Sequence, residues 1–134
     1  MSVSVYFLCN SAICPSKASP DSVGYDLHSA SRVEISPGCR ALVPTGLAIK
    51  LPSSIYVKIA PRLGYSLRNL DVIPGIVNPE SLCEIKVLVQ NNSNEDLCIN
   101  PGERIAQLIF AKHHNIALQV VRNKSNQPQI LRCL

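Results

Sequence analysis

The sequence predicts an all-β domain, folded as a sandwich or barrel of short strands. Hydrophobic residues make up 46% of the 134 residues but aromatic residues only 4%. The core must therefore consist mainly of Val, Ile and Leu, which favours strands. Short segments in which apolar and polar residues alternate recur along the chain, and turns that contain proline separate them. Because helical periodicity is almost absent, these observations indicate a single all-β unit.

The first half of the chain contains several expected strands and one brief helical turn. Alternation of apolar and polar residues marks the strands, which are 3–7, 33–35, 40–44, 45–51 and 55–59. The segments between them contain Pro20, Pro37 and Pro52. Proline fixes φ and cannot donate a backbone hydrogen bond, so these segments are predicted to be turns. Residues 63–69 are the one stretch where we expect a helical turn.

Residues 71–91 are predicted to form a β-hairpin that projects from a stiff sheet. Its expected arms are 72–77 and 84–90, and its tip begins at Asn78 and Pro79, which favour a turn. The second arm alternates apolar and polar residues, which is typical of a strand with one buried face. Residues at such a tip are well placed to contact ligands.

After the hairpin, the same alternation predicts further strands at 97–99, 104–110 and 116–120. The pattern ends beyond Arg122. We therefore expect a β domain over residues 1–121 and a C-terminal tail over 122–134.

The charge and hydropathy of the chain exclude two classes of partner. Thirteen Lys and Arg residues against nine Asp and Glu residues give a net charge of +4, and the positive charges are scattered. Without a basic stripe, we expect no nucleic acid partner. No segment approaches the ~18–20 apolar residues of a membrane span, so no membrane partner is expected. The first ten residues lack the features of a signal peptide, which predicts an intracellular protein of the cytoplasm or nucleus that is not secreted.

The cysteines are expected to be free thiols that act mostly as small buried hydrophobic residues. The chain has six of them, at Cys9, Cys14, Cys39, Cys83, Cys98 and Cys133. No pair has the Cys-x-x-Cys spacing of a zinc or redox site. His113 and His114 are adjacent rather than one helical turn apart, so a metal site is not expected there.

Four segments, in the right order and at compatible spacing, resemble the motifs of the trimeric dUTP pyrophosphatases (dUTPases). These segments are 22–30, 60–64, 75–83 and 102–108. The resemblance implies a distorted jelly-roll (β-clip) barrel that assembles as a homotrimer, with each active site shared between subunits. It also implies that the hairpin backbone holds uracil, and that an aspartate at its tip activates the water that attacks the α-phosphate.

Magnesium is the cofactor that the resemblance implies for an active member, held mainly by the substrate phosphates. Asp26 would then face the Mg²⁺ ion through water, and Arg62 and Gln107 would meet the phosphates. The positions that match substrate-binding residues of the family are Arg62, Gly64, Ser66, Gly75, Ser81 and Gln107. Other roles stay open, because Asp26 could cap a turn, Arg62 could pair with Glu80 or another acid, and Gln107 could satisfy backbone groups of the trimer.

The sequence departs from the family pattern where the chemistry is done. The water-activating aspartate falls on Asn78, the sugar-packing tyrosine on Ser81 and a phosphate-binding serine on Leu63. An amide takes up no proton at neutral pH, and loss of a general base costs about 10² to 10⁴ in rate. The residues that close the third motif fall on Leu82 and Cys83, and the glycine-rich C-terminal phosphate clamp is missing.

These departures predict a dUTPase-like protein that has lost dUTP hydrolysis and serves a binding or regulatory role. Several viral lineages carry dUTPase-like proteins of this kind, so the resemblance implies a viral protein with a host protein as partner. Two alternatives remain. One is an active or weak Mg²⁺-dependent diphosphatase in which Glu80 replaces the base, and the other is a nucleotide-binding module without turnover. The apolar C-terminus also resembles, weakly, peptides that strand-addition domains capture.

Overall fold

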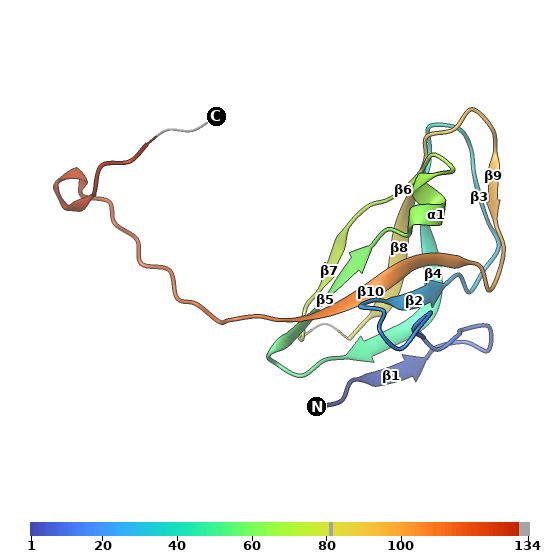
Figure 1. The fold of residues 1–134 in the computed structure, drawn as a ribbon, viewed down its shortest axis with the longest axis horizontal. Helices are drawn as coiled ribbons and strands as arrows, with labels where there is room; N and C mark the ends of the chain where they lie inside the picture. Colours follow the sequence, from blue (N-terminus) through green and yellow to red (C-terminus); the bar gives the residue numbers. More distant parts are fainter. Residues whose placement is uncertain (81, 132–134) are drawn as a thin grey trace.

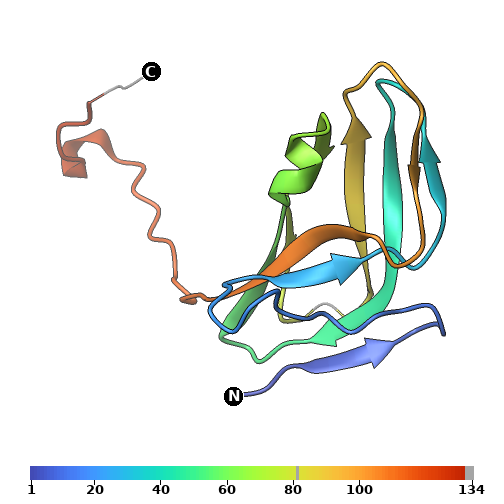
Figure 2. The same ribbon diagram turned by 45° about the vertical axis from the view of Figure 1, so that its right-hand side comes forward.

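A computed structural model describes residues 1–80 and 82–131. Two four-stranded sheets form the body of this part of the chain (Figures 1 and 2). The first has the order β1 (Ser4–Phe7), β4 (Arg40–Lys50), β8 (Glu84–Asn91) and β6 (Leu70–Val72). The second has the order β2 (Tyr25–His28), β10 (Arg104–Lys112), β5 (Ile55–Ala60) and β7 (Gly75–Val77). A two-stranded sheet of β3 (Val33–Ile35) and β9 (Leu97–Ile99) lies beside them.

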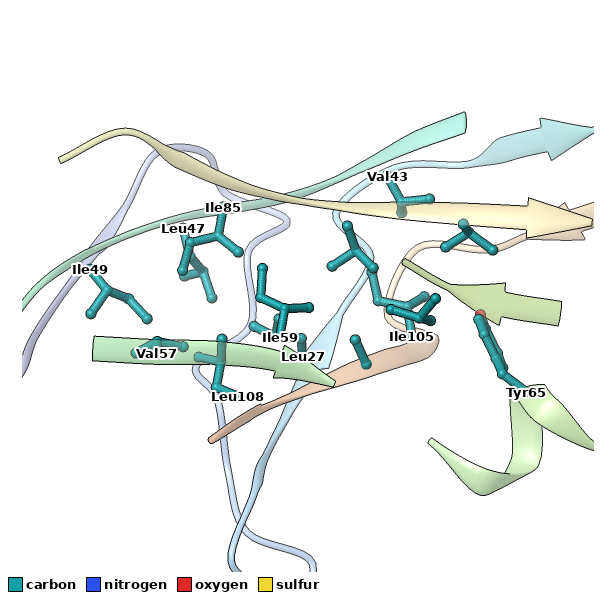
Figure 3. Close-up of a cluster of buried hydrophobic side chains, with 14 of the residues drawn as sticks. Leu27, Val43, Leu47, Ile49, Val57, Ile59, Tyr65, Ile85, Ile105 and Leu108 are labelled. Carbon is teal, nitrogen blue, oxygen red and sulfur yellow. The ribbon is translucent and has the colours of Figure 1, made fainter. Parts of the chain in front are cut away.

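The core lies between the two main sheets and consists almost wholly of aliphatic side chains, which confirms the all-β prediction and its basis. Figure 3 shows side chains from both sheets meeting there, among them Leu47 and Ile85 from the first sheet and Val57, Ile59 and Leu108 from the second. The one aromatic residue among the buried members of this cluster is Tyr65, which reaches it from the short helix α1 (Leu63–Ser66). Alternation along each strand places these residues on the inner face.

The two arms of the predicted hairpin belong to different sheets, so the prediction of a paired hairpin over residues 71–91 is wrong near its tip. β6 pairs with β8, and this ladder ends where the backbone N–H of Ile73 donates to the carbonyl of Leu88 at 2.9 Å. Pro74 follows and has no N–H to donate. Beyond it the chain crosses over, and β7 pairs with β5 instead.

β4 is one strand where the sequence predicts two. Its pairing with β8 is irregular between Pro44 and Ala48, around Gly46, which has a φ of +68°. A Cβ atom at Gly46 would lie 2.5 Å from the Cys9 Sγ, so only glycine fits both the conformation and the space. The buried Thr45 Oγ1 donates to the Ile85 carbonyl at 2.6 Å and bridges the break in the ladder.

The strand predicted at residues 116–120 does not form in the described part of the chain. After β10 the backbone leaves the domain, as both views show (Figures 1 and 2), and contains a short 3₁₀ helix at Lys124–Asn126. Ile116, Leu118 and Val120 are 72%, 89% and 71% exposed. The alternation is that of a strand, but a strand also needs a hydrogen-bonding partner, which this segment lacks among the described residues. The domain boundary at residue 121 stays a prediction.

The cysteines lie mainly at the surface, so the expectation of buried thiols is wrong. Cys9, Cys14, Cys39 and Cys83 are exposed and Cys98 is half-buried, while Cys133 lies outside the described residues. The exposed ones occupy connecting segments, and the strands fill the core with Val, Ile and Leu instead. No helix in the described ranges is long and apolar enough to cross a membrane.

Candidate functional site

Asp26 and Arg62 form an ion pair at one face of the second sheet. Asp26 lies in β2 opposite Gln107 of β10, and Gln107 lies opposite Ala60 at the end of β5, two residues before Arg62. The Arg62 Nε is 3.1 Å from the Asp26 Oδ1, and only 12% of the Asp26 side chain is exposed. The Arg104 Nε lies 4.0 Å from the other carboxylate oxygen. Asp26 therefore serves an ion pair rather than a turn cap, and Arg62 pairs with it rather than with Glu80.

Gln107 holds the segment that precedes Arg62. Its Nε2 donates to the Pro61 carbonyl at 3.0 Å. Gly24 allows this position, because a Cβ atom there would clash with the Gln107 Oε1. Gln107 thus donates to a backbone group of its own chain, whereas the alternative expected for it was a backbone group of the trimer.

Four of the sequence-predicted residues line one open cleft of about 440 Å³, here called the Asp26 cleft. They are Asp26, Arg62, Gly64 and Gln107, and the cleft is completed by Ala18, Ser22, Val23, Gly24, Leu63 and Ile109. Leu63 and Val23 are each 75% exposed, so its rim is apolar. Two arginines against one carboxylate give the region around Asp26 a net positive charge, which suits an anionic ligand.

The hairpin-tip residues lie in a different cleft of about 600 Å³, here called the tip cleft. It is lined by Ser53, Ser54, Asn78, Pro79, Glu80, His113 and Asn115, and it shares no lining residue with the Asp26 cleft. Two other sequence-predicted residues line neither cleft. Gly75 lies in β7 opposite Ile59, and Ser66 is the last residue of α1. Ser81 lies outside the described residues.

The residues at Asp26 do not fit a directly coordinated metal ion. Both carboxylate oxygens of Asp26 face arginine side chains. Within residues 1–80 and 82–131, no group of three or more His, Cys, Asp and Glu side chains is placed to hold a metal. A divalent cation needs several oxygen ligands, and a carboxylate paired with a guanidinium offers few.

His28 is a polar residue of this region that the sequence did not single out. Its Nδ1 is buried and has no hydrogen-bond partner among the described residues. Burial lowers the pKa of His28 below its ordinary 6.5, an effect that Asp26 opposes and that the positive charges of Arg104 and Arg62 reinforce. The neutral imidazole is therefore the form that suits the folded chain.

Because the pKa of His28 is lowered on folding, the unfolded chain binds its proton first as the pH falls. The contribution of neutral His28 to stability is thus complete above the unfolded pKa of 6.5 and is lost as the pH falls through the lower folded pKa. We expect His28→Gln to reduce the loss of stability between about pH 7.5 and pH 5 in urea unfolding. The exposed His114→Gln is the matched control. Equal pH dependence in the natural chain and His28→Gln would contradict this assignment.

Tyr65 anchors α1 to the turn that precedes β10. Its buried hydroxyl donates to the Glu103 carboxylate, next to Arg104. Burial and this bond raise the pKa of Tyr65 well above its ordinary value, so the hydroxyl stays a donor. Arg62 is the N-cap residue of α1, so this bond ties the helix that follows Arg62 to the turn before β10.

Tyr65→Phe removes this bond but keeps the ring in the core. We expect a loss of about 1.5–3 kcal/mol in the free energy of unfolding, as for other hydrogen bonds to charged groups. Urea unfolding measures it, with Tyr6→Phe at the exposed β1 as the control. An unfolding midpoint for Tyr65→Phe equal to that of the natural chain would show that the bond contributes nothing.

The fold and the paired charges define a β-sandwich protein with a cleft that contains two arginines and one aspartate, and comparison with known proteins shows the family. The dUTPase family model matches residues 10–130. The deoxyuridine 5'-triphosphate nucleotidohydrolase of Syntrophotalea carbinolica is 33% identical over 126 residues, which cover 90% of this chain and 86% of the relative. The enzyme of that name from vaccinia virus is 37% identical over 114 residues, covering 85% and 78%. The chain belongs to the dUTPase family.

Solved structures agree with the family at the level of the fold. One is a mutant dUTPase from phage phi11 of Staphylococcus aureus, whose structure was described for the coordination of a structural Mg(II) ion. It matches this chain with a TM-score of 0.87 at 20% sequence identity, and the match covers 92% of this chain and 98% of the phage chain. Another is the dUTPase of Staphylococcus bacteriophage 80alpha, described in connection with phage dUTPases that control transfer of virulence genes. Its TM-score is 0.85 at 21% sequence identity, and the match covers 91% of this chain and 97% of the phage chain. The predicted dUTPase fold is confirmed.

Sequence reasoning missed several contacts at the tip cleft and beside Arg62. Ser53 and His113 meet because Ile55 and Lys112 are register partners in β5 and β10, and the His113 Nε2 then lies 2.7 Å from the Ser53 carbonyl. No spacing in the sequence indicates this contact. The Tyr65 bond to Glu103 likewise joins residues 38 positions apart.

Proposed function

We propose that this dUTPase-family protein does not hydrolyse dUTP and acts by binding. The observation that carries the proposal is Asn78 at the hairpin tip, where the family resemblance places the aspartate that activates water. Asn78 is exposed and lines the tip cleft. A carboxamide accepts no proton near neutral pH, so a nucleophilic water there has no base at this position.

Leu63 supports the same proposal from the other cleft. It lines the Asp26 cleft, and its side chain has no hydrogen-bond donor. The family resemblance implies a phosphate-binding serine at this position. Arg62 is already committed to Asp26 at 3.1 Å. The cleft therefore offers a phosphate chain fewer free donors than the family motif implies.

We infer a homotrimer in which the two clefts of different copies meet. Within one chain the Asp26 cleft and the tip cleft share no lining residue, which supports an arrangement in which another copy brings its hairpin tip to Asp26. Sedimentation equilibrium tests the assembly, and a monomer at all concentrations would overturn it. The protein that the assembly binds is inferred to be a host protein, by analogy with the viral dUTPase-like proteins that the family resemblance brings in.

Hydrolysis of dUTP to dUMP and diphosphate is the second candidate function. The relatives favour it, since those compared above are named as dUTP nucleotidohydrolases. Glu80 is then the carboxylate available at the tip. A shift of two residues moves a group by up to about 7 Å along an extended chain, whereas a general base must act within about 3.2 Å. Magnesium would be required for this function, held mainly by substrate phosphates rather than by this chain.

A diphosphate-release assay with dUTP and Mg²⁺ separates the two functions. We expect no release above background from the natural chain. Release that disappears in Glu80→Gln would establish the second function instead. Calorimetric titration with a non-hydrolysable dUTP analogue then tells whether the nucleotide is still bound, and absence of heat would exclude a nucleotide as the ligand.

A further inference from the structure

An apolar groove of about 340 Å³ opens at one end of the core, and we call it the Tyr25 groove. The first sheet provides one wall, where Val5 of β1 is the register partner of Ile49 in β4. The second sheet provides another, through Tyr25 of β2 and Phe110 of β10. Figure 3 shows Ile49 at one end of the buried cluster. The space between the two sheets therefore reaches the surface at this groove.

The walls of the Tyr25 groove are apolar and partly open to water. The residues that pack against the core but stay only half-buried are Val3, Val5, Tyr25 and Phe110. The rings of Tyr25 and Phe110 meet edge to face with their centres 5.5 Å apart, which holds both in place. Small-molecule sites in proteins are concave, mostly apolar and about 300–1,000 Å³ in volume. The groove is at the lower end of that range, so it fits a short apolar chain.

A third wall of the groove is formed by Cys14 and Pro15, which lie in the segment between β1 and β2. The backbone of this segment is attached to the second sheet, because the Asp26 N–H donates to the Ser16 carbonyl at 2.8 Å. Pro15 fixes its own φ just before that bond and stiffens the chain there. The third wall is therefore held in place by the fold.

Lys17 brings a positive charge to the rim of the groove. Its Nζ lies 5.3 Å from the centre of the Tyr25 ring, and the attraction between an ammonium and an aromatic face favours that position. No Asp or Glu pairs with Lys17 in the part of the chain that the structure describes. The groove lining also contains no acidic residue. The charge at the rim is thus free to pair with an anionic group of a ligand.

We propose that the Tyr25 groove binds a medium-chain fatty acid, with its alkyl chain against Val5, Ile49 and Phe110 and its carboxylate paired with the Lys17 ammonium. Apolar walls cover the chain, and one cation at the rim matches the single charge of a carboxylate. The groove shares no lining residue with the Asp26 cleft or the tip cleft. This binding goes beyond the proposed function and does not depend on whether dUTP is hydrolysed.

Calorimetric titration with sodium octanoate tests the site. We expect saturable binding with a Kd between micromolar and millimolar, the range open to a ligand of this size. Cys14→Trp fills the groove from its exposed wall and should weaken the binding by about tenfold or more. Cys39→Trp is the matched control, because Cys39 is also exposed but lies outside the groove. Thermal unfolding confirms that both variants are folded. No saturable heat, or equal binding by the two variants, would overturn the proposal.

Lys17→Met tests the pairing with the carboxylate. We expect it to weaken the binding of octanoate about twofold to fivefold, the effect of losing an exposed ion pair, and to leave the binding of 1-octanol unchanged. Lys58→Met, at an exposed position of β5, is the control and should change neither. If 1-octanol bound the natural chain as tightly as octanoate and Lys17→Met changed neither affinity, the ligand would not be a carboxylate and the proposal would be wrong.

Cys14 reports on occupancy of the groove in the natural chain, because it is exposed and lines the groove. Octanoate at about ten times its Kd should slow the alkylation of Cys14 by iodoacetamide roughly tenfold, since the ligand then covers this thiol in most molecules. Cys9, Cys39 and Cys83 are exposed outside the groove and should react at unchanged rates. Mass spectrometry of the digested protein measures each rate separately. Equal slowing at all four thiols, or none at Cys14, would overturn the proposal.

Discussion

Replacing Asn78 by aspartate is expected to raise diphosphate release from dUTP by about 10² to 10⁴ over the natural chain. The change is nearly isosteric and introduces a carboxylate that can accept the proton of an attacking water. Asn78 is exposed and lines an open cleft, so a charge there carries little cost in stability. The comparison of the two chains in one assay, with Mg²⁺ and equal protein, isolates the missing base from every other difference.

Two further variants give this result its meaning. Asn78→Asp combined with Leu63→Ser should be faster still, because the serine hydroxyl restores a phosphate donor in the Asp26 cleft. Glu80→Gln in the natural chain should change nothing. If the natural chain already turns over dUTP as fast as Asn78→Asp, another group activates water and the proposed loss of hydrolysis is wrong. If neither variant turns over, the site has lost more than its base.

Arg62→Met is expected to lower the free energy of unfolding by about 2 kcal/mol. The substitution keeps most of the side-chain volume but leaves the Asp26 carboxylate, only 12% exposed, with Arg104 at 4.0 Å. Removing one partner of a fully buried pair costs about 3–5 kcal/mol. The value is smaller here because 29% of the Arg62 side chain is exposed.

A double-mutant cycle with Asp26→Asn measures the pair itself. The double variant should be more stable than the sum of the two single losses predicts, since each single change leaves one charge without its main partner. Arg32→Met is the matched control. The Arg32–Glu34 pair is shorter, at 2.7 Å, but its side chains are 60% and 67% exposed, so its loss should leave stability nearly unchanged. Equal effects of Arg62→Met and Arg32→Met would show that burial of Asp26 does not matter.

Much of the fold could be predicted because strand positions follow from local alternation. The aliphatic core and the strand at β8 agree with the sequence in place and in buried face. The error at residues 116–120 has the same origin, because alternation reports a suitable strand and not the presence of a partner. The hairpin prediction was wrong near its tip for a different reason. Alternation does not show which strand a segment pairs with, and after Pro74 the chain leaves its ladder with β8 and β7 pairs with β5 in the other sheet.

The functional groups of the candidate site could be predicted from the sequence, but the contacts between them could not. Asn78 and Leu63 lack the proton acceptor and the donor that the family motifs require, and this follows from residue type alone. The partner of Arg62 did not follow, because it depends on β10 lying between β2 and β5.

The strand-rich class, the aliphatic core and the chemical character of each motif position follow from the amino-acid sequence, because they depend on periodicity and on functional groups. The folded chain was needed to show that Asp26 meets Arg62, that the hairpin tip lies in a separate cleft, and that the core opens into the Tyr25 groove. Alternation determines which face of a strand is buried, whereas the neighbours of that strand are set by pairings between residues far apart in the chain.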